Sequence, residues 1–125
     1  TDQKEVEVEV SDFQKTVKII EAIGMKFNRR QENLREEWSY KGAQITIDSW
    51  PGLETFTEIE AGSEESVKNI FLELGFDWNN KLIMPASDLY AKVFGINLDE
   101  SFDKISHITF ENNPFKDMKK LWPVN

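Results

Sequence analysis

The stretch that decides the fold runs from Gln44 to Gly62 and reads QITIDSWPGLETFTEIEAG. Polar and apolar residues alternate on either side of a central Trp-Pro-Gly, as is typical of two half-buried strands joined by a turn. Proline presets φ and glycine tolerates a positive φ, so both residues favour a bend at 50–52. The pattern therefore predicts an antiparallel hairpin with one apolar face and one polar face.

The polar face of this hairpin carries three carboxylates. Asp48 shares its face with Gln44 and Thr46, while Glu58 shares its face with Glu60 on the second strand. Converging carboxylates repel one another, so a divalent cation or a cationic side chain usually compensates them. A solvated acidic face is also ordinary for an antiparallel sheet, and short motifs give many false positives, so both interpretations stay open.

Length and composition point to one domain, residues 1–125, with a modest core. The net charge of −8 argues against a nucleic acid polymer or an anionic membrane as partner. The chain has no cysteine and no apolar run of membrane-spanning length. A cytoplasmic location is therefore the default expectation.

The N-terminal part predicts a strand followed by a helix. Residues 5–10 alternate Glu and Val, which predicts a strand with Glu7 and Glu9 on one face. Ser11 begins a capping box that predicts the start of a helix. The buried stripe of this helix is predicted to comprise Phe13, Val17, Ile20 and Ile23.

A long strand is predicted next, at residues 25–40, with Arg29 and Arg35 on one face and a turn at Lys41-Gly42. Capping residues and apolar stripes indicate two helices beyond the hairpin, and an apolar run indicates a short strand near the C-terminus. These elements are predicted at residues 63–74, 88–94 and 105–110.

The strands thus have a polar face each, and the helices have apolar stripes that need a surface to cover. A curved antiparallel sheet with helices outside and a polar lumen satisfies both requirements. We therefore expect an α+β protein built on an antiparallel β-barrel. The predicted lumen carries both charge signs, from Arg29, Arg35, Asp48, Glu58 and Glu60, as a metal–polyphosphate site requires.

The segment I-D-x-W-P-G-L-x-x-F-x-E-I-E-x-G-S-E-E, residues 47–65, resembles the second half of the CYTH domain. That superfamily contains class IV adenylate cyclases, thiamine triphosphatases and the wider triphosphate tunnel metalloenzymes. The resemblance extends in register from about Glu5 to Gly75 and more weakly to Phe110. It implies a tunnel that binds a triphosphate together with Mg²⁺ or Mn²⁺.

The resemblance also implies roles for individual residues. Arg35 looks like the arginine that contacts the triphosphate and serves catalysis. The implied metal ligands are Asp48, Glu58 and Glu60, the last two also catalytic, and Glu7 and Glu9 look like the substrate-binding acids of the strand that begins the second half of the tunnel. Arg29, which the strand pattern places in the lumen, is expected to bind the substrate as well.

Two departures from the family pattern matter. Asn33 stands where these families often have a lysine, and the family's E-x-E-x-K strand has no match in this chain. The chain is therefore expected to lack the N-terminal part of the tunnel, to form a partial barrel and to be inactive by itself. Pairing of two copies into a homodimer, with cations between the acidic faces, is one way to close the barrel.

Two functions follow from these observations. The first is a divalent-metal-dependent phosphohydrolase or nucleotide cyclase that acts on a nucleoside, thiamine or inorganic triphosphate. The alternative is a catalytically degenerate relative that keeps the fold as a binding or assembly module, as Asn33 and the missing first half suggest.

Overall fold

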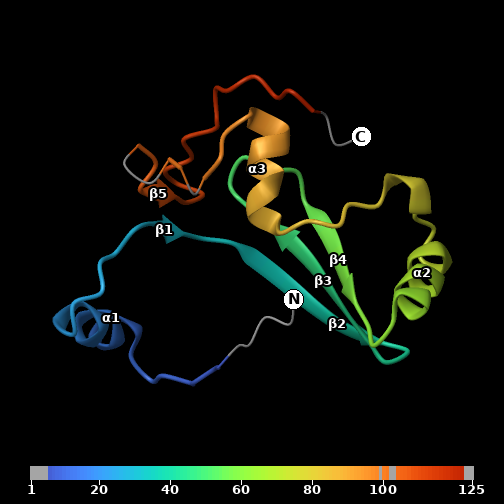
Figure 1. Cartoon of the computed structure of the whole chain (residues 1–125), viewed down its shortest axis with the longest axis horizontal. Coiled ribbons are helices and arrows are strands. Elements are labelled where there is room, and N and C mark those ends of the chain that lie inside the picture. Colours follow the sequence, from blue (N-terminus) through green and yellow to red (C-terminus); the bar gives the residue numbers. More distant parts are fainter. Residues whose placement is uncertain (1–5, 99, 102–103, 123–125) are drawn as a thin grey trace.

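The centre of the structure is one antiparallel sheet of three strands, in the order β2-β3-β4 (Figure 1). This computed structural model describes residues 6–98, 100–101 and 104–122. A separate two-stranded parallel ladder joins β1 to β5. The elements in chain order are α1 (Phe13–Ala22), β1 (Arg30–Gln31), β2 (Leu34–Tyr40), β3 (Ala43–Ser49), β4 (Phe56–Glu60), α2 (Glu64–Glu73), the 3₁₀ helix η1 (Trp78–Asn80), α3 (Ala86–Phe94) and β5 (His107–Ile108).

The β2–β3 hairpin has the tight turn that the sequence predicts. Tyr40 pairs with Ala43, so Lys41 and Gly42 alone form the loop. Both have positive φ, 49° and 79°, as a type I′ turn requires. The turn fixes the register of the hairpin and thereby places Arg35 directly opposite Asp48.

Helix α2 covers part of the apolar face of the sheet. The Ser63 hydroxyl accepts a hydrogen bond from the Ser66 N–H at 3.2 Å and caps the helix, as predicted. Ile70 is buried with Ala43 and Ile45. Because side chains alternate along a strand, Thr46 and Asp48 must lie on the opposite, polar face.

A second core lies between α3 and the C-terminal segment. It contains Tyr90, Val93, Phe94, Leu98, Ile108 and Phe115. The Tyr90 hydroxyl donates a hydrogen bond to the Pro51 carbonyl oxygen at 2.9 Å, and its ring lies 6.2 Å from that of Trp50. The predicted Trp-Pro-Gly bend is therefore held in place by the C-terminal part of the chain.

Two predictions about the N-terminal part are wrong. Residues 6–10, the described part of the predicted strand, are exposed and form no strand, and Glu7 and Glu9 are exposed with them. The cap of α1 is Asp12 instead of Ser11, with its side chain 2.9 Å from the Lys15 N–H, and no residue of α1 is buried. Alternation specifies the two faces of a strand, but a strand must also pair with a neighbouring one, and residues 6–10 pair with none of the described strands.

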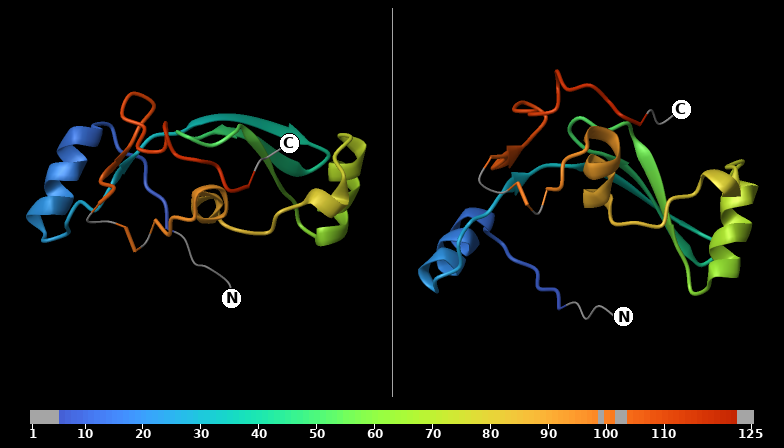
Figure 2. Two further views of the ribbon diagram at one scale, coloured as in Figure 1. Left: turned by 90° about the horizontal axis from the view of Figure 1, so that it is seen from above. Right: turned by 45° about the horizontal axis from the view of Figure 1, so that its top comes forward.

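The expected barrel is present only as an open sheet. The described residues form one three-stranded sheet and one two-stranded ladder, and no closed barrel. The long strand predicted at 25–40 breaks at residues 32–33, because β1 turns away from the hairpin to pair with β5. The two views in Figure 2 show α1 apart from the sheet, so the expectation of helices packed outside holds for α2 but not for α1.

No helix within the described part of the chain is long and apolar enough to cross a membrane.

Substitution of Gly52 by alanine tests the contact between the Trp-Pro-Gly bend and the C-terminal core. Its φ is 86°, and a Cβ placed there would lie 2.9 Å from the Phe115 Cβ. Gly42 has a similar φ but open space around it, so Gly42→Ala is a matched control for backbone strain. We expect Gly42→Ala to cost about 1–2 kcal/mol and Gly52→Ala about 1–3 kcal/mol more, in urea denaturation. Equal losses would show that Phe115 moves aside at no cost.

Candidate functional site

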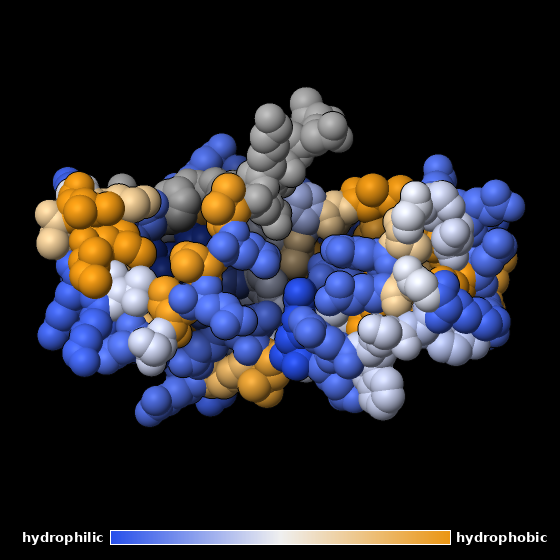
Figure 3. All heavy atoms as spheres, turned by 90° about the horizontal axis from the view of Figure 1, so that it is seen from below, coloured by the Kyte–Doolittle hydropathy of each residue, from blue (hydrophilic) through white to orange (hydrophobic). Residues whose placement is uncertain are grey.

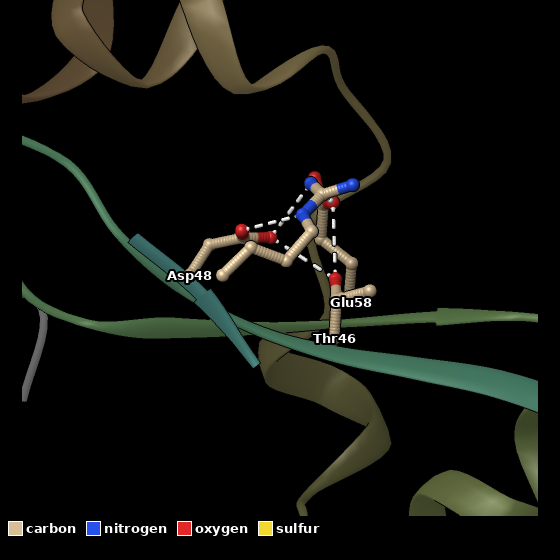
Figure 4. Close-up of polar contacts among 4 residues, drawn as sticks. Thr46, Asp48 and Glu58 are labelled. Carbon is tan, nitrogen blue, oxygen red and sulfur yellow. Dashed lines mark hydrogen bonds and ion pairs between the residues drawn. The ribbon is translucent and has the colours of Figure 1, made fainter. Parts of the chain in front are cut away.

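The polar face of the sheet gathers one arginine, two carboxylates and a hydroxyl from three adjacent strands (Figure 4). Strand pairing explains why they meet. Arg35 on β2 lies opposite Asp48 on β3, and Thr46 on β3 lies opposite Glu58 on β4. We call Arg35, Thr46, Asp48 and Glu58 the charged cluster.

The Arg35 guanidinium links both carboxylates of the cluster. Its Nε and Nη2 donate to the two oxygens of Asp48 at 2.7 and 2.9 Å, which is a bidentate pair. Nη2 also donates to Glu58 Oε2 at 3.0 Å. The Thr46 hydroxyl has one proton, which we assign to Asp48 Oδ2 at 3.0 Å over Glu58 Oε2 at 3.4 Å.

The two carboxylates have opposite electrostatic surroundings. Burial by itself raises the pKa of the fully buried Asp48, but the hydrogen bonds from Arg35 and Thr46 outweigh it and hold that pKa below its usual value. Burial raises the pKa of Glu58, and the negative charge of Asp48 raises it further, while Arg35 opposes the shift without cancelling it. Asp48 is thus held as an anion, whereas Glu58 is a stronger base than an ordinary glutamate.

The structure brings together three of the predicted site residues, Arg35, Asp48 and Glu58. Glu60 is exposed on the same face, opposite Gln44, and its charge contributes to the raised pKa of Glu58.

The other predicted substrate-binding residues do not join them. Arg29 donates from Nε to the Ile105 carbonyl at 3.0 Å and from Nη2 to the Leu98 carbonyl, so it binds the C-terminal segment. Glu7 and Glu9 lie exposed in the N-terminal segment, outside any strand. Arg29 and Arg35 were predicted to share one face of one strand, and the break at residues 32–33 invalidates that argument.

Thr46 is a member of the cluster that sequence analysis did not single out. It was placed on the polar face but given no role. The signal was available, because Thr46 lies two residues before Asp48 and therefore on the same side of the strand. A buried threonine next to a carboxylate usually donates its proton to it, since a buried hydroxyl needs a partner.

The oxygen atoms of the charged cluster are suitable ligands for a hard cation. Mg²⁺ and Mn²⁺ prefer oxygen ligands, and Mg²⁺ usually takes only one or two carboxylates together with water and substrate phosphates. Asp48 and Glu58, with the Thr46 hydroxyl beside them, provide such a set. Within the described ranges no three His, Cys, Asp or Glu residues are placed to hold a metal, so a cation would depend on further oxygens from a ligand or water.

The pKa shifts lead to opposite predictions for the two carboxylates. Because the pKa of Asp48 is lowered, its ionised form stabilises the fold above the unfolded value of about 3.9, and this stabilisation is lost as the pH falls through the lower, folded value. Because the pKa of Glu58 is raised, the folded state holds that proton more tightly, and stability falls as the pH rises through the folded value.

We therefore expect Asp48→Asn to lower the free energy of unfolding by about 1–3 kcal/mol at neutral pH, discounted for the partial exposure of Arg35. Glu58→Gln, its matched counterpart, should raise the free energy of unfolding. Urea denaturation at pH 7 measures both, and both differences should shrink as the pH falls and the carboxylates become protonated, Glu58 before Asp48. A Glu58→Gln variant as unstable as Asp48→Asn would contradict the opposite pKa shifts.

Comparison with known proteins identifies the family but gives no near relative. No curated protein and no solved structure matches the chain. Among protein-family models, that of the CYTH domain matches residues 1–93. These residues include the whole hairpin, the charged cluster and α2. Because the match spans well over half of the sequence, this protein belongs to the CYTH domain family, within the triphosphate tunnel superfamily.

Proposed function

We propose that the charged cluster binds a triphosphate together with Mg²⁺ or Mn²⁺, and that the protein is a phosphohydrolase or nucleotide cyclase acting on that triphosphate. The observation that carries the proposal is the single guanidinium that bridges Asp48 and Glu58. An arginine fork fits phosphate oxygens as well as it fits carboxylates, and the two carboxylates fit a hard cation. The cluster thus contains a cationic group for the phosphates and carboxylates for the metal, and these groups are paired with each other.

Each residue of the cluster then has a task. Arg35 neutralises phosphate charge and orients the chain of phosphates through its planar donors. Glu58, whose pKa is raised, is suited to accept a proton from the attacking group. Thr46 holds Asp48 in its orientation. A bound cation would add charge neutralisation at the phosphate oxygens, held by Asp48 and Glu58 together with oxygens of the ligand and of water, while the neighbouring Glu60 adds negative charge.

The nature of the attacking group separates the two activities. Water gives hydrolysis of a nucleoside, thiamine or inorganic triphosphate, whereas the ribose hydroxyl of ATP gives cyclisation with release of pyrophosphate. The same proton acceptor serves either attack, so the cluster accommodates both. Assays of phosphate, pyrophosphate and cyclic nucleotide release with Mn²⁺, on ATP, thiamine triphosphate and tripolyphosphate, distinguish them.

A binding or assembly module is the second candidate, and one observation favours it. Asn33 leaves Arg35 as the cluster's one cation among the described residues, and Arg35 is already paired with two carboxylates. A triphosphate carries several negative charges, so a single arginine compensates it poorly. Tripolyphosphate binding without turnover of any triphosphate would support this candidate.

The first test measures the binding of Mn²⁺ and tripolyphosphate by calorimetry. Glu58→Gln should weaken Mn²⁺ binding in the presence of tripolyphosphate by about tenfold, or 1.4 kcal/mol, because one hard oxygen ligand is lost. Glu73→Gln is the matched control, since Glu73 pairs with Lys41 on the other side of the sheet. Identical isotherms for the two variants would remove Glu58 from the site.

The second test uses the competition between Arg35 and the cation for the same carboxylate oxygens. Arg35→Gln should bind Mn²⁺ alone about three- to tenfold more tightly than wild type, because a competing positive charge is gone. The same variant should bind tripolyphosphate more weakly. Arg30→Gln is the control, since Arg30 pairs with Glu32 at 3.7 Å outside the cluster. Unchanged or weaker Mn²⁺ binding by Arg35→Gln would show that the guanidinium and the cation use different oxygens.

A further inference from the structure

Helix α1 has an apolar stripe that the described part of the chain leaves largely uncovered. Phe13, Val17 and Ile20 lie on one side of the helix at the spacing of an amphipathic helix. Phe13 is 71% exposed and Ile20 40% exposed. In Figure 3, hydrophobic side chains gather at the end of the molecule where α1 lies. A stripe of this kind normally faces a core or a partner.

The apolar face of the sheet has an open groove beside α2. Its volume is about 340 Å³, and it is lined by Trp38, Ser39, Tyr40, Ile45, Ile47, Thr57, Leu74 and Phe76. Helix α2 packs along the β4 side of this face, which leaves Trp38 57% exposed on β2. No charged residue lines the groove, so its chemistry suits apolar side chains and excludes a phosphate ligand.

These two surfaces are complementary but cannot meet within one chain in this arrangement. Figures 1 and 2 show α1 and α2 at opposite ends of the molecule. The segment after α1 is anchored at the far end, because the Arg30 N–H donates to the Ser106 carbonyl at 2.8 Å and the Glu32 N–H donates to the Ile108 carbonyl at 2.9 Å.

The exposed area independently indicates a missing contact. The chain exposes 10071 Å². A compact monomer of 14.6 kDa exposes about 6,900 Å² by the usual size scaling. The excess of about 3,200 Å² exceeds the roughly 800 Å² that each partner contributes to an interface of standard size. One copy therefore exposes more surface than a stable dimer needs to bury.

We propose that two copies of this chain exchange α1, so that Phe13, Val17 and Ile20 of each copy occupy the apolar groove of the other. A twofold arrangement makes both contacts at once and leaves neither stripe uncovered. A second helix beside α2 continues the layer that α2 already forms on this face. Charge also favours the exchange, because α1 carries two lysines against one glutamate whereas the whole chain has a net charge of −8.

Sedimentation of the 125-residue chain over a range of concentrations tests the exchange. The wild type should be a dimer, and Ile20→Asp should weaken the dimer by about tenfold or more, because it buries an unpaired charge. Ala22→Asp is the matched control, since it adds the same charge at an exposed position on the opposite side of α1. A monomeric wild type, or a dimer equally sensitive to both substitutions, would overturn the proposal.

Disulfide trapping identifies the groove and shows which chain fills it. The 125-residue sequence has no cysteine, so Ile20→Cys and Ile47→Cys each introduce a single thiol. Mixing the two variants under mild oxidation should give the heterodimer as the main product. A doubly substituted chain that closes its disulfide within a monomer would show that α1 reaches its own groove, and the exchange would be refuted.

Chelation separates this contact from pairing through the acidic faces. The groove contains no carboxylate, so a chelator should leave the dimer intact. A dimer that dissociates on chelation is held by cations on the polar faces, which contradicts the exchange of α1.

Discussion

A fully buried carboxylate needs a partner within hydrogen-bond reach, and Asp48 finds it in Arg35 on the neighbouring strand. The pair forms only when β2 and β3 align so that these residues are opposite each other. A shift by one residue would turn Arg35 to the apolar face and leave Asp48 buried alone. Glu58 on β4 accepts a hydrogen bond from the same guanidinium. The Arg35 side chain therefore links all three strands, and its two ion pairs form only when the strands have this alignment.

The strand that carries Asp48 leads directly into the aromatic core. Two residues further on, the bend at 50–52 passes under α3, where Tyr90 binds the Pro51 carbonyl and Phe115 packs against Gly52. The charged cluster and the aromatic core therefore meet at the C-terminal end of β3, where Asp48 belongs to the first and Trp50 packs against the second. The family match ends at residue 93, yet Leu98, Ile108 and Phe115 supply much of this core. The environment of the site thus depends on residues outside the recognised domain.

Local signals explain what sequence reasoning predicted correctly. The hairpin follows from alternation and from Lys41-Gly42, and α2 follows from its cap at Ser63. The meeting of Arg35, Asp48 and Glu58 required only the correct parity on each strand. These features depend on neighbours in the sequence, where the physical preferences are strongest.

The wrong predictions concern residues whose position depends on segments that are distant in the sequence. Arg29 was assigned by parity along one strand, but β1 leaves the hairpin to pair with β5, and a ladder of two residues has no recognisable pattern. Glu7 and Glu9 sit in a perfect alternation that finds no sheet edge. Thr46 was placed on the polar face but received no role, because its importance comes from the burial of Asp48, which the sequence pattern does not reveal.

The parallel ladder between β1 and β5 has a consequence for how the molecule forms. Arg30 pairs with His107, so this contact joins segments separated by most of the chain. Contacts of that kind form slowly, because the entropy of closing the loop must be overcome before any of them is gained. We expect the β2–β3–β4 sheet to form first because its connections are short, whereas the aromatic core around Trp50 needs the distant Ile108 and Phe115. The core around Trp50 is therefore completed by contacts between segments that are distant in the sequence.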